Sequence, residues 1–319
     1  MKLFILILTT LLTMPLAAQD APAPDKKQGV EYIINDRYPV NTSAKYKFTQ
    51  ISDVKRIFED GAEREFSREL VYYLTIAAPS GSEDGFQELF ISIDSMEYYF
   101  KEKDMEIKYD SQDEESMPPL RHKDFEFHSI PLGKNYEIFL SPYGEVAKIE
   151  GQKLLDDRLY IEESGLTDKL KMNYWMKGLS DLNLTYISDI AKGILPNSKV
   201  TRDTSWTSPF MTRLEGVFFR DTAITELEDV NVSDYTLVST VNDLTPDKSP
   251  AMVYGIDELV SVTGGKASGT YIVNINTQGI IGNTQESFEA VLECKAGNIS
   301  FRDKVKKLAT WELDKHYRW

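Results

Sequence analysis

Residues 70–76, LVYYLTI, place an apolar or aromatic side chain at every second position, namely Leu70, Tyr72, Leu74 and Ile76. Side chains of a β-strand point alternately to the two faces of a sheet, so this spacing predicts a strand with one buried face. The same alternation recurs along the chain at Met105, Ile107 and Tyr109; Tyr136, Ile138 and Leu140; Tyr235, Leu237, Ser239 and Val241; and Tyr271, Val273 and Ile275. We therefore expect antiparallel sheets with one solvated face.

The middle of the chain has the apolar spacing of helices rather than strands. One predicted helix begins after a capping residue, Thr167 or Asp168, and ends at Gly178. A second begins after Ser180, continues to Pro196, and has an apolar stripe made of Leu182, Ile187, Ile190 and Ile194. The order of strands, helices and strands predicts an α+β fold.

The first 18 residues, MKLFILILTTLLTMPLAA, combine one positive charge at Lys2 with an apolar run that ends at Leu16. This pattern is typical of a secretory signal peptide and is too short for a membrane span. No cysteine lies near the expected cleavage site, at Ala18 or Gln19, to accept a lipid. We therefore expect a periplasmic or secreted protein that is neither a lipoprotein nor membrane-spanning.

A Pro-, Ala- and charge-rich stretch, DAPAPDKKQG, follows the leader and has little to bury. It predicts a flexible tether, with order beginning near Ala44. The predicted organisation is a signal peptide over 1–18, a tether over 19–43, a β-rich half over 44–151, a helical connector over 152–195 and a second β-rich half over 196–319.

The two β-rich halves share a short pattern. Tyr136 begins one alternating strand eight residues before Gly144, and Tyr271 begins another eight residues before Gly279. This repeat predicts duplication of a β-rich unit. The alternative remains open, because any hairpin with a left-handed glycine has a similar sequence.

The charge of the chain argues against a nucleic-acid partner, and its cysteine content argues against a disulfide. The chain has 51 acidic and 36 basic residues and a formal net charge of −15, which repels phosphate backbones, so no nucleic-acid partner is expected. The single cysteine, Cys294, excludes an intramolecular disulfide. It continues the alternating row of Phe288, Ala290 and Leu292, which predicts a buried thiol.

Three segments carry a resemblance to a known family: KYDSQDEE at 108–115, LSPYGEVAKIEG at 140–151 and DTSW at 203–206. Together with the leader they resemble an uncharacterised family of secreted bacterial envelope proteins. The resemblance implies curved antiparallel sheets with helices against a concave face, similar to the half-barrels of periplasmic lipoprotein carriers; together with the repeat above, this predicts two duplicated half-barrel units. It supplies no catalytic residues.

Histidines and carboxylates are concentrated in one short segment. On a strand, one face would carry His122, Asp124, Glu126 and His128, with Phe125 and Phe127 directed to the core. These are suitable ligands for a divalent metal. Strand residues advance by about 3.3 Å each, however, so His122 and His128 lie too far apart for one ion, and a solvated polar face is expected instead.

Other catalytic and cofactor signals are weak. The acidic loop of Asp110, Asp113, Glu114 and Glu115 lacks the spacing of a calcium-binding loop. The sequence contains no His-Glu-x-x-His, Gly-x-Ser-x-Gly, phosphate-binding loop or Cys-x-x-Cys motif. We therefore expect no catalytic residues, cofactor or metal.

These observations favour a non-enzymatic extracytoplasmic protein. It would bind a hydrophobic small molecule or an envelope protein in a cleft between sheet and helices. The candidate cleft-lining residues are Leu182, Ile187, Ile190 and Ile194. The alternatives are a hydrolase with an unrecognised site and a structural component of an envelope assembly.

Overall fold

The computed structural model describes residues 30–34, 38–79, 85–141, 144–164, 169–196 and 198–319. The predicted signal peptide and the helix caps at Thr167 and Asp168 lie outside these residues, as does most of the predicted tether. The compact unit that contains the described strands and helices begins at Glu31. Tyr32, within the predicted tether, forms a bridge with Val200, so the chain is paired with the fold at this point, before the expected start of order near Ala44.

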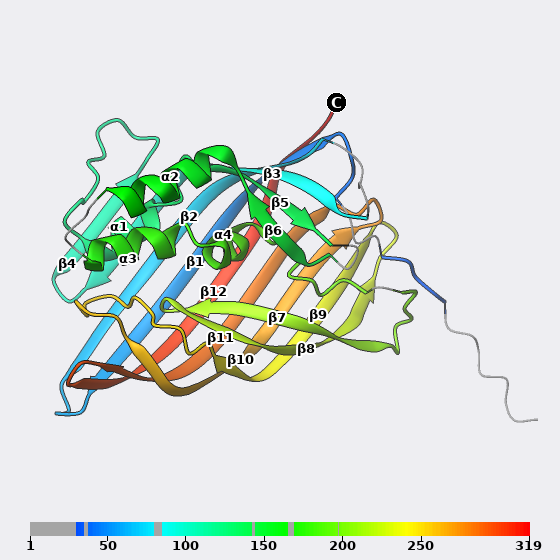
Figure 1. The fold of residues 1–319 in the computed structure, drawn as a ribbon. Helices are drawn as coiled ribbons and strands as arrows, with labels where there is room; N and C mark the ends of the chain where they lie inside the picture. The colour runs from blue at the N-terminus through cyan, green and yellow to red at the C-terminus, as the bar shows by residue number, and fades with distance from the viewer. Residues whose placement is uncertain (1–29, 35–37, 80–84, 142–143, 165–168, 197) are drawn as a thin grey trace, which may run out of the picture. The chain divides into compact units, whose positions relative to one another are not determined.

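Within the described residues, twelve strands form one curved, open, antiparallel sheet, which confirms the predicted fold class (Figure 1). The strand order is β6-β5-β3-β2-β1-β12-β11-β10-β9-β8-β7, with β4 paired to β3. The strands are β1 (Thr42–Phe58), β2 (Glu63–Ala78), β3 (Gln87–Glu102), β4 (Met105–Asp110), β5 (Asn135–Leu140), β6 (Val146–Glu150), β7 (Ser205–Leu214), β8 (Val217–Val230), β9 (Asp234–Pro246), β10 (Ser261–Asn276), β11 (Ile281–Ala296) and β12 (Ile299–Arg318).

Most of the alternating rows of the sequence form the buried face of this sheet; the row of Met105, Ile107 and Tyr109 in β4 is an exception, because Met105 is exposed and the other two are only partly buried. In β2, Leu70, Tyr72, Leu74 and Ile76 are each at most 2% exposed. The row in β11 continues to Cys294, which is also buried, as predicted. Burial raises the pKa of the Cys294 thiol to about 12. The thiol is therefore protonated and unreactive at neutral pH.

The helices lie together against one face of the sheet (Figure 1). Those in the described residues are α1 (Lys123–Ser129), α2 (Gln152–Glu163), α3 (Lys169–Gly178) and α4 (Asp181–Ser188). The last three confirm a helical segment between the two sets of strands. In the described parts of the chain, none of the helices has the length and apolar character needed to cross a bilayer.

Helix α4 begins as predicted but ends earlier. The Ser180 side chain accepts a hydrogen bond from the Asn183 backbone N–H and caps the helix. The helix stops at Ser188 instead of Pro196, because the backbone leaves helical geometry at Asp189, where φ is −82° and ψ is 85°. Ile190 and Ile194 therefore lie beyond the helix rather than on its apolar stripe.

Residues 123–129 form a helix, so the strand predicted there is wrong. His122 accepts a hydrogen bond from the Phe125 backbone N–H and caps α1. Helical geometry then places Asp124 and His128 on one face, four residues apart, and this face packs on the sheet. Phe125 and Phe127 alternate as in a strand, and the segment is too short for its apolar residues to show the 3.6-residue period of a helix.

Strands β1 and β12 pair along their whole common length and join the two predicted halves into one sheet, as the neighbouring blue and red strands of Figure 1 show. Each half is an antiparallel meander whose strands follow one another in the same direction across the sheet. Gly144 and Gly279 both have positive φ, of 77° and 83°. Both the duplication and the hairpin alternative account for these glycines, so the duplication stays a prediction.

Candidate functional site

A groove with a volume of about 750 Å³ lies between the two edges of the sheet. Edge strand β6 contributes one side, edge strand β7 and its neighbour β8 contribute another, and α4 and the turn after it lie between them. The apolar lining consists of Val146, Ala147, Ile149, Leu182, Pro209, Phe210 and Met211. The charged lining consists of Glu145, Lys148, Asp181, Asp189, Lys192, Arg220 and Asp221.

Lys192 separates this groove from the buried face of the sheet. Its Nζ lies 4.5 Å from the ring centre of Tyr186 and 5.1 Å from that of Trp311, within range of a cation–π interaction. The Asp189 side chain accepts a hydrogen bond of 2.9 Å from the Lys192 backbone N–H. Burial raises the pKa of Asp189 to about 6. The inner end of the groove is therefore aromatic and holds one inward-facing ammonium group.

Glu286 lies behind Lys192 and balances its charge. Its Oε2 is 3.5 Å from Lys192 Nζ, and its Oε1 accepts a hydrogen bond of 2.6 Å from Lys307 Nζ. Burial raises the pKa of Glu286, but the two lysines outweigh this effect and the net shift is downward. Burial lowers the pKa of Lys307 to about 7, despite Glu286. This cluster is part of the core beneath the groove.

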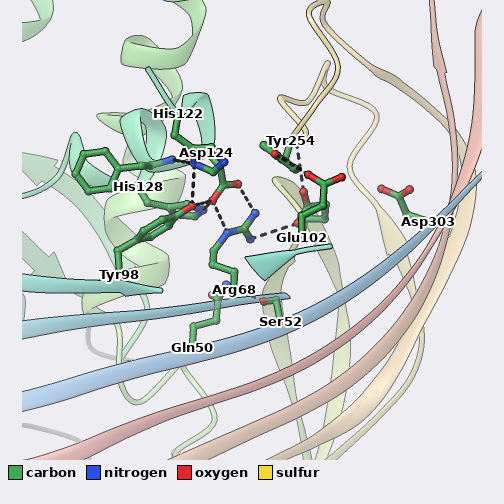
Figure 2. Close-up of polar contacts among 12 residues, drawn as sticks. Gln50, Ser52, Arg68, Tyr98, Glu102, His122, Asp124, His128, Tyr254 and Asp303 are labelled. Carbon is green, nitrogen blue, oxygen red and sulfur yellow. Dashed lines mark hydrogen bonds and ion pairs between the residues drawn. The ribbon is translucent and has the colours of Figure 1, made fainter. Parts of the chain in front are cut away.

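A second buried cluster joins α1 to the sheet (Figure 2). Arg68 on β2 binds both carboxylate oxygens of Asp124, with an Nε–Oδ2 distance of 2.6 Å. The Tyr98 hydroxyl donates to Asp124 Oδ2 at 2.7 Å, and Arg68 Nη1 lies 3.3 Å from Glu215 Oε2. Burial raises the pKa of Asp124, but Arg68 outweighs it and the pKa is lowered. Asp124 is therefore ionised when the protein is folded.

His128 of α1 and the capping residue His122 are also part of this cluster. His128 Nε2 lies 3.9 Å from Asp124 Oδ2, and burial lowers the pKa of both His122 and His128. Asp124 and His128 are buried, so the expected solvated polar face is wrong: the helix directs both side chains to the sheet. The adjoining cavity has a volume of only about 20 Å³, too small for a substrate. Within the described residues, no group of three or more His, Cys, Asp or Glu side chains is arranged to hold a metal.

The predicted cleft residues lie in two different environments. Leu182 lines the groove. Ile187, Ile190 and Ile194 are fully buried in the hydrophobic core and do not line it. Leu182 is thus the one member of this set that lies where a ligand could contact it, and its role in binding stays a prediction.

Sequence reasoning missed the charged residues of the buried face, although the sequence contains a signal for them. Lys307 occupies a position in the row of Val305, Ala309 and Trp311, and Glu286 occupies one in the row of Phe288 and Ala290. An ionisable residue inside an alternating apolar row marks a buried charge that needs a partner. The partners themselves could not be inferred, because strand register was unknown.

No family model and no curated protein matches the chain. Similar solved structures include lipovitellin, described for its lipid–protein interactions, with 10% identity, a TM-score of 0.45 and coverage of 88% of this chain and 26% of that chain. The β domain of the Bordetella autotransporter BrkA has 8% identity, a TM-score of 0.27 and coverage of 85% and 100%. An outer membrane channel from Pseudomonas putida F1 has 6% identity, a TM-score of 0.24 and coverage of 87% and 97%.

The chain thus spans about a quarter of the length of the lipovitellin chain. At these identities and TM-scores the similarities carry no argument about function. The curved antiparallel sheet that the envelope-family resemblance implies is confirmed by the strand order. Membership of that family stays a prediction.

Proposed function

We propose that this protein binds a largely apolar ligand in the groove between β6, α4 and β7. The observation that carries the proposal is the groove itself, with its volume of about 750 Å³ and the apolar side chains of Val146, Leu182 and Met211 in its lining. Small-molecule sites are typically clefts of about 300–1,000 Å³ with mostly apolar walls and few polar groups. The groove matches this description in size and offers apolar contact surface, and its lining carries more charged side chains than such sites usually have.

The energy of such binding would come from apolar contact. Leu182 and Met211 are partly exposed in the groove, and Phe210 lies behind them. Removing apolar surface from water stabilises a complex by about 25 cal/mol per Å². Burial of about 200 Å² would therefore contribute roughly 5 kcal/mol before the entropy of association is subtracted.

We place this activity outside the cytoplasm, on the basis of Lys2 and the apolar run that ends at Leu16. These residues lie outside the described part of the chain, so the location rests on the sequence pattern alone. Mass spectrometry of protein recovered from the producing cell tests it. The expected mature chain begins at Gln19, Asp20 or Ala21 and is recovered without detergent.

Two alternatives each have one supporting observation. Asp189 is a groove carboxyl whose pKa burial raises to about 6, a property of many catalytic acids, and this favours a hydrolase. Met117, Leu120 and Tyr160 are each more than 70% exposed near α1 and α2, and this favours an envelope partner that covers them. Both observations are weaker than the groove, because neither brings together the groups that the function would need.

Fluorescence of the neutral apolar probe N-phenyl-1-naphthylamine tests the proposal. Wild-type protein should bind the probe, and Leu182→Asp should weaken binding about tenfold or more, because the new carboxylate projects into the groove. The matched control is Leu155→Asp, which places the same charge on an exposed position of α2. Equal effects of the two substitutions, or no binding by wild type, would contradict the proposal. Turnover of ester or glycoside substrates that Asp189→Asn abolishes would favour the hydrolase.

A further inference from the structure

A second cavity, of about 150 Å³, adjoins the groove. Leu182 lines both spaces, so they lie on two sides of the same side chain. Arg220 of the groove also lies 3.9 Å from Asp247 of the second cavity. We call this second space the Arg213 pocket, because Arg213 is the most deeply buried cation in its lining.

Arg213 forms no ion pair with a described residue, although the charge of buried Glu215 lies close enough to raise its pKa against the larger, lowering effect of burial. Its side chain is 3% exposed, and no described carboxylate lies within 4.0 Å of it. Nη1 donates to the Asn183 amide oxygen, and Nη2, which is buried, has no hydrogen-bond partner among the described residues. The guanidinium also lies 4.9 Å from the ring centre of Tyr186. The Tyr186 ring and the Asn183 amide oxygen therefore leave part of the hydrogen-bonding capacity of the guanidinium unused.

The other buried arginines show what Arg213 lacks. Arg56 makes two hydrogen bonds of 2.7 Å to the carboxylate of Asp303. Arg68 likewise donates hydrogen bonds to both carboxylate oxygens of Asp124. A buried charge without such a partner is costly. Arg213 therefore has both the capacity and the energetic reason to accept an anion.

The remaining lining of the pocket supplies a second cation and a hydroxyl group. Lys177 on α3 is half-buried, no described carboxylate lies within 4.0 Å of its ammonium group, and burial lowers its pKa. Ser249 contributes a hydroxyl group, whereas the Ser180 hydroxyl already donates to the Lys177 backbone oxygen at 2.7 Å. The one carboxylate in the lining, Asp247, is engaged by Arg220 at 3.9 Å and by the Ser249 backbone N–H at 2.9 Å. The pocket thus has two cations and one partly neutralised anion.

We propose that the Arg213 pocket binds the anionic head group, a phosphate or carboxylate, of an amphipathic ligand whose apolar part lies in the groove. This inference rests on the proposed function, because the groove must first bind an apolar chain. The planar guanidinium is suited to two oxygens of one anion, and Lys177 adds a point charge beside it. The head group would hydrogen-bond the Nη2 atom that has no partner within the described chain.

Competition against N-phenyl-1-naphthylamine distinguishes the contribution of the head group to binding from the contribution of the apolar chain. The competitors are dodecyl phosphate, uncharged dodecanol and inorganic phosphate. For wild type, dodecyl phosphate should displace the probe at a concentration about tenfold or more below that of dodecanol. Arg213→Met and, independently, Lys177→Met should each reduce this advantage to about twofold or less, and the exposed control Lys153→Met should leave it unchanged.

The outcomes are distinguishable. If the probe binds but both dodecyl compounds compete equally, the head-group inference fails and the proposed function stands. If the probe does not bind wild type, the proposed function itself fails. Inorganic phosphate that binds as tightly as dodecyl phosphate would overturn the amphipathic ligand and indicate a free-anion site. Lys177→Met keeps the test decisive if Arg213→Met does not fold.

Discussion

Ionised side chains occupy the buried face of the sheet at positions where the alternating pattern otherwise places apolar residues. The Arg56–Asp303 pair crosses from β1 to β12 with both side chains 0% exposed. Arg56 also donates to the backbone oxygen of Tyr254, so every polar contact of the pair is internal. Such pairs contribute little net stability, but breaking one leaves a charge without a partner.

We expect Asp303→Asn to lower the free energy of unfolding by about 3–5 kcal/mol, because it leaves the Arg56 charge buried and unpaired. The double variant Arg56→Met/Asp303→Leu should lose much less, because it removes both charges. Urea denaturation measures both values. A single substitution that costs under about 1 kcal/mol, or a double variant worse than the single one, would contradict the assignment.

His128 should make the protein less stable at mildly acidic pH. Burial lowers the pKa of His128 in the folded state, whereas an unfolded histidine takes up a proton below about 6.5. The unfolded state then binds more protons, so stability falls as the pH is lowered from 7 to 5, by at most about 1.4 kcal/mol per pH unit for one group. His128→Asn should flatten this slope, and the exposed control His316→Asn should leave it unchanged. Identical slopes in wild type and His128→Asn would refute the prediction.

For individual side chains, the sequence allows burial to be inferred but not the partners of buried charges. The burial of Cys294 followed from one alternating row, because a row is local information. Pairing of Arg56 with Asp303, or of Lys307 with Glu286, depends on which strands are neighbours and in what register. A single sequence does not contain that register, so the buried charges could be noticed but their partners could not be named.

The local sequence pattern predicts the start of one helix correctly, whereas another helix depends on contacts between residues distant in the chain. The start of α4 was predicted from Ser180, because a side chain that caps a helix acts on residues close in sequence. The identity of α1 was missed, because seven residues with two alternating phenylalanines fit either period. What fixes α1 as a helix includes the contact of Asp124 with Arg68, a residue far away in the chain.

Removal of the α4 cap should destabilise the region around the groove. Ser180→Ala deletes the acceptor for the Asn183 backbone N–H and should cost about 1 kcal/mol of unfolding free energy. Ser198→Ala, at an exposed position outside any helix or strand, is the control and should cost less than about 0.5 kcal/mol. Thermal and urea denaturation of the three proteins give the comparison. Equal stability of Ser180→Ala and wild type would show that the cap has no role.

At the level of the whole sheet, the first and last strands hold the two meanders together. A chain that ends at Asn298 lacks β12 and would expose the edges of both β1 and β11. We expect this truncation to abolish the cooperative urea transition and the near-ultraviolet circular dichroism signal. Truncation after Leu313 removes mostly exposed residues and should preserve both. A folded chain without β12 would show that the first meander is an independent domain.

The architecture also explains why the groove could not be located from the sequence. Strands β6 and β7 are separated by the whole helical segment, and they flank one groove only because the sheet curves between its two edges. Leu182 was identified because it lies on an apolar helix face. Val146, Phe210 and Met211 were not, because their contribution depends on that curvature.

Methyl NMR of protein labelled at Leu, Val and Met, titrated with N-phenyl-1-naphthylamine, tests the central claim most directly. The account predicts saturable shifts at Val146, Leu182 and Met211, which line the groove. It predicts no shifts at Met117 and Leu120, which are exposed but lie outside the groove. Shifts confined to Met117 and Leu120, or no saturable shift at the groove methyl groups, would contradict it.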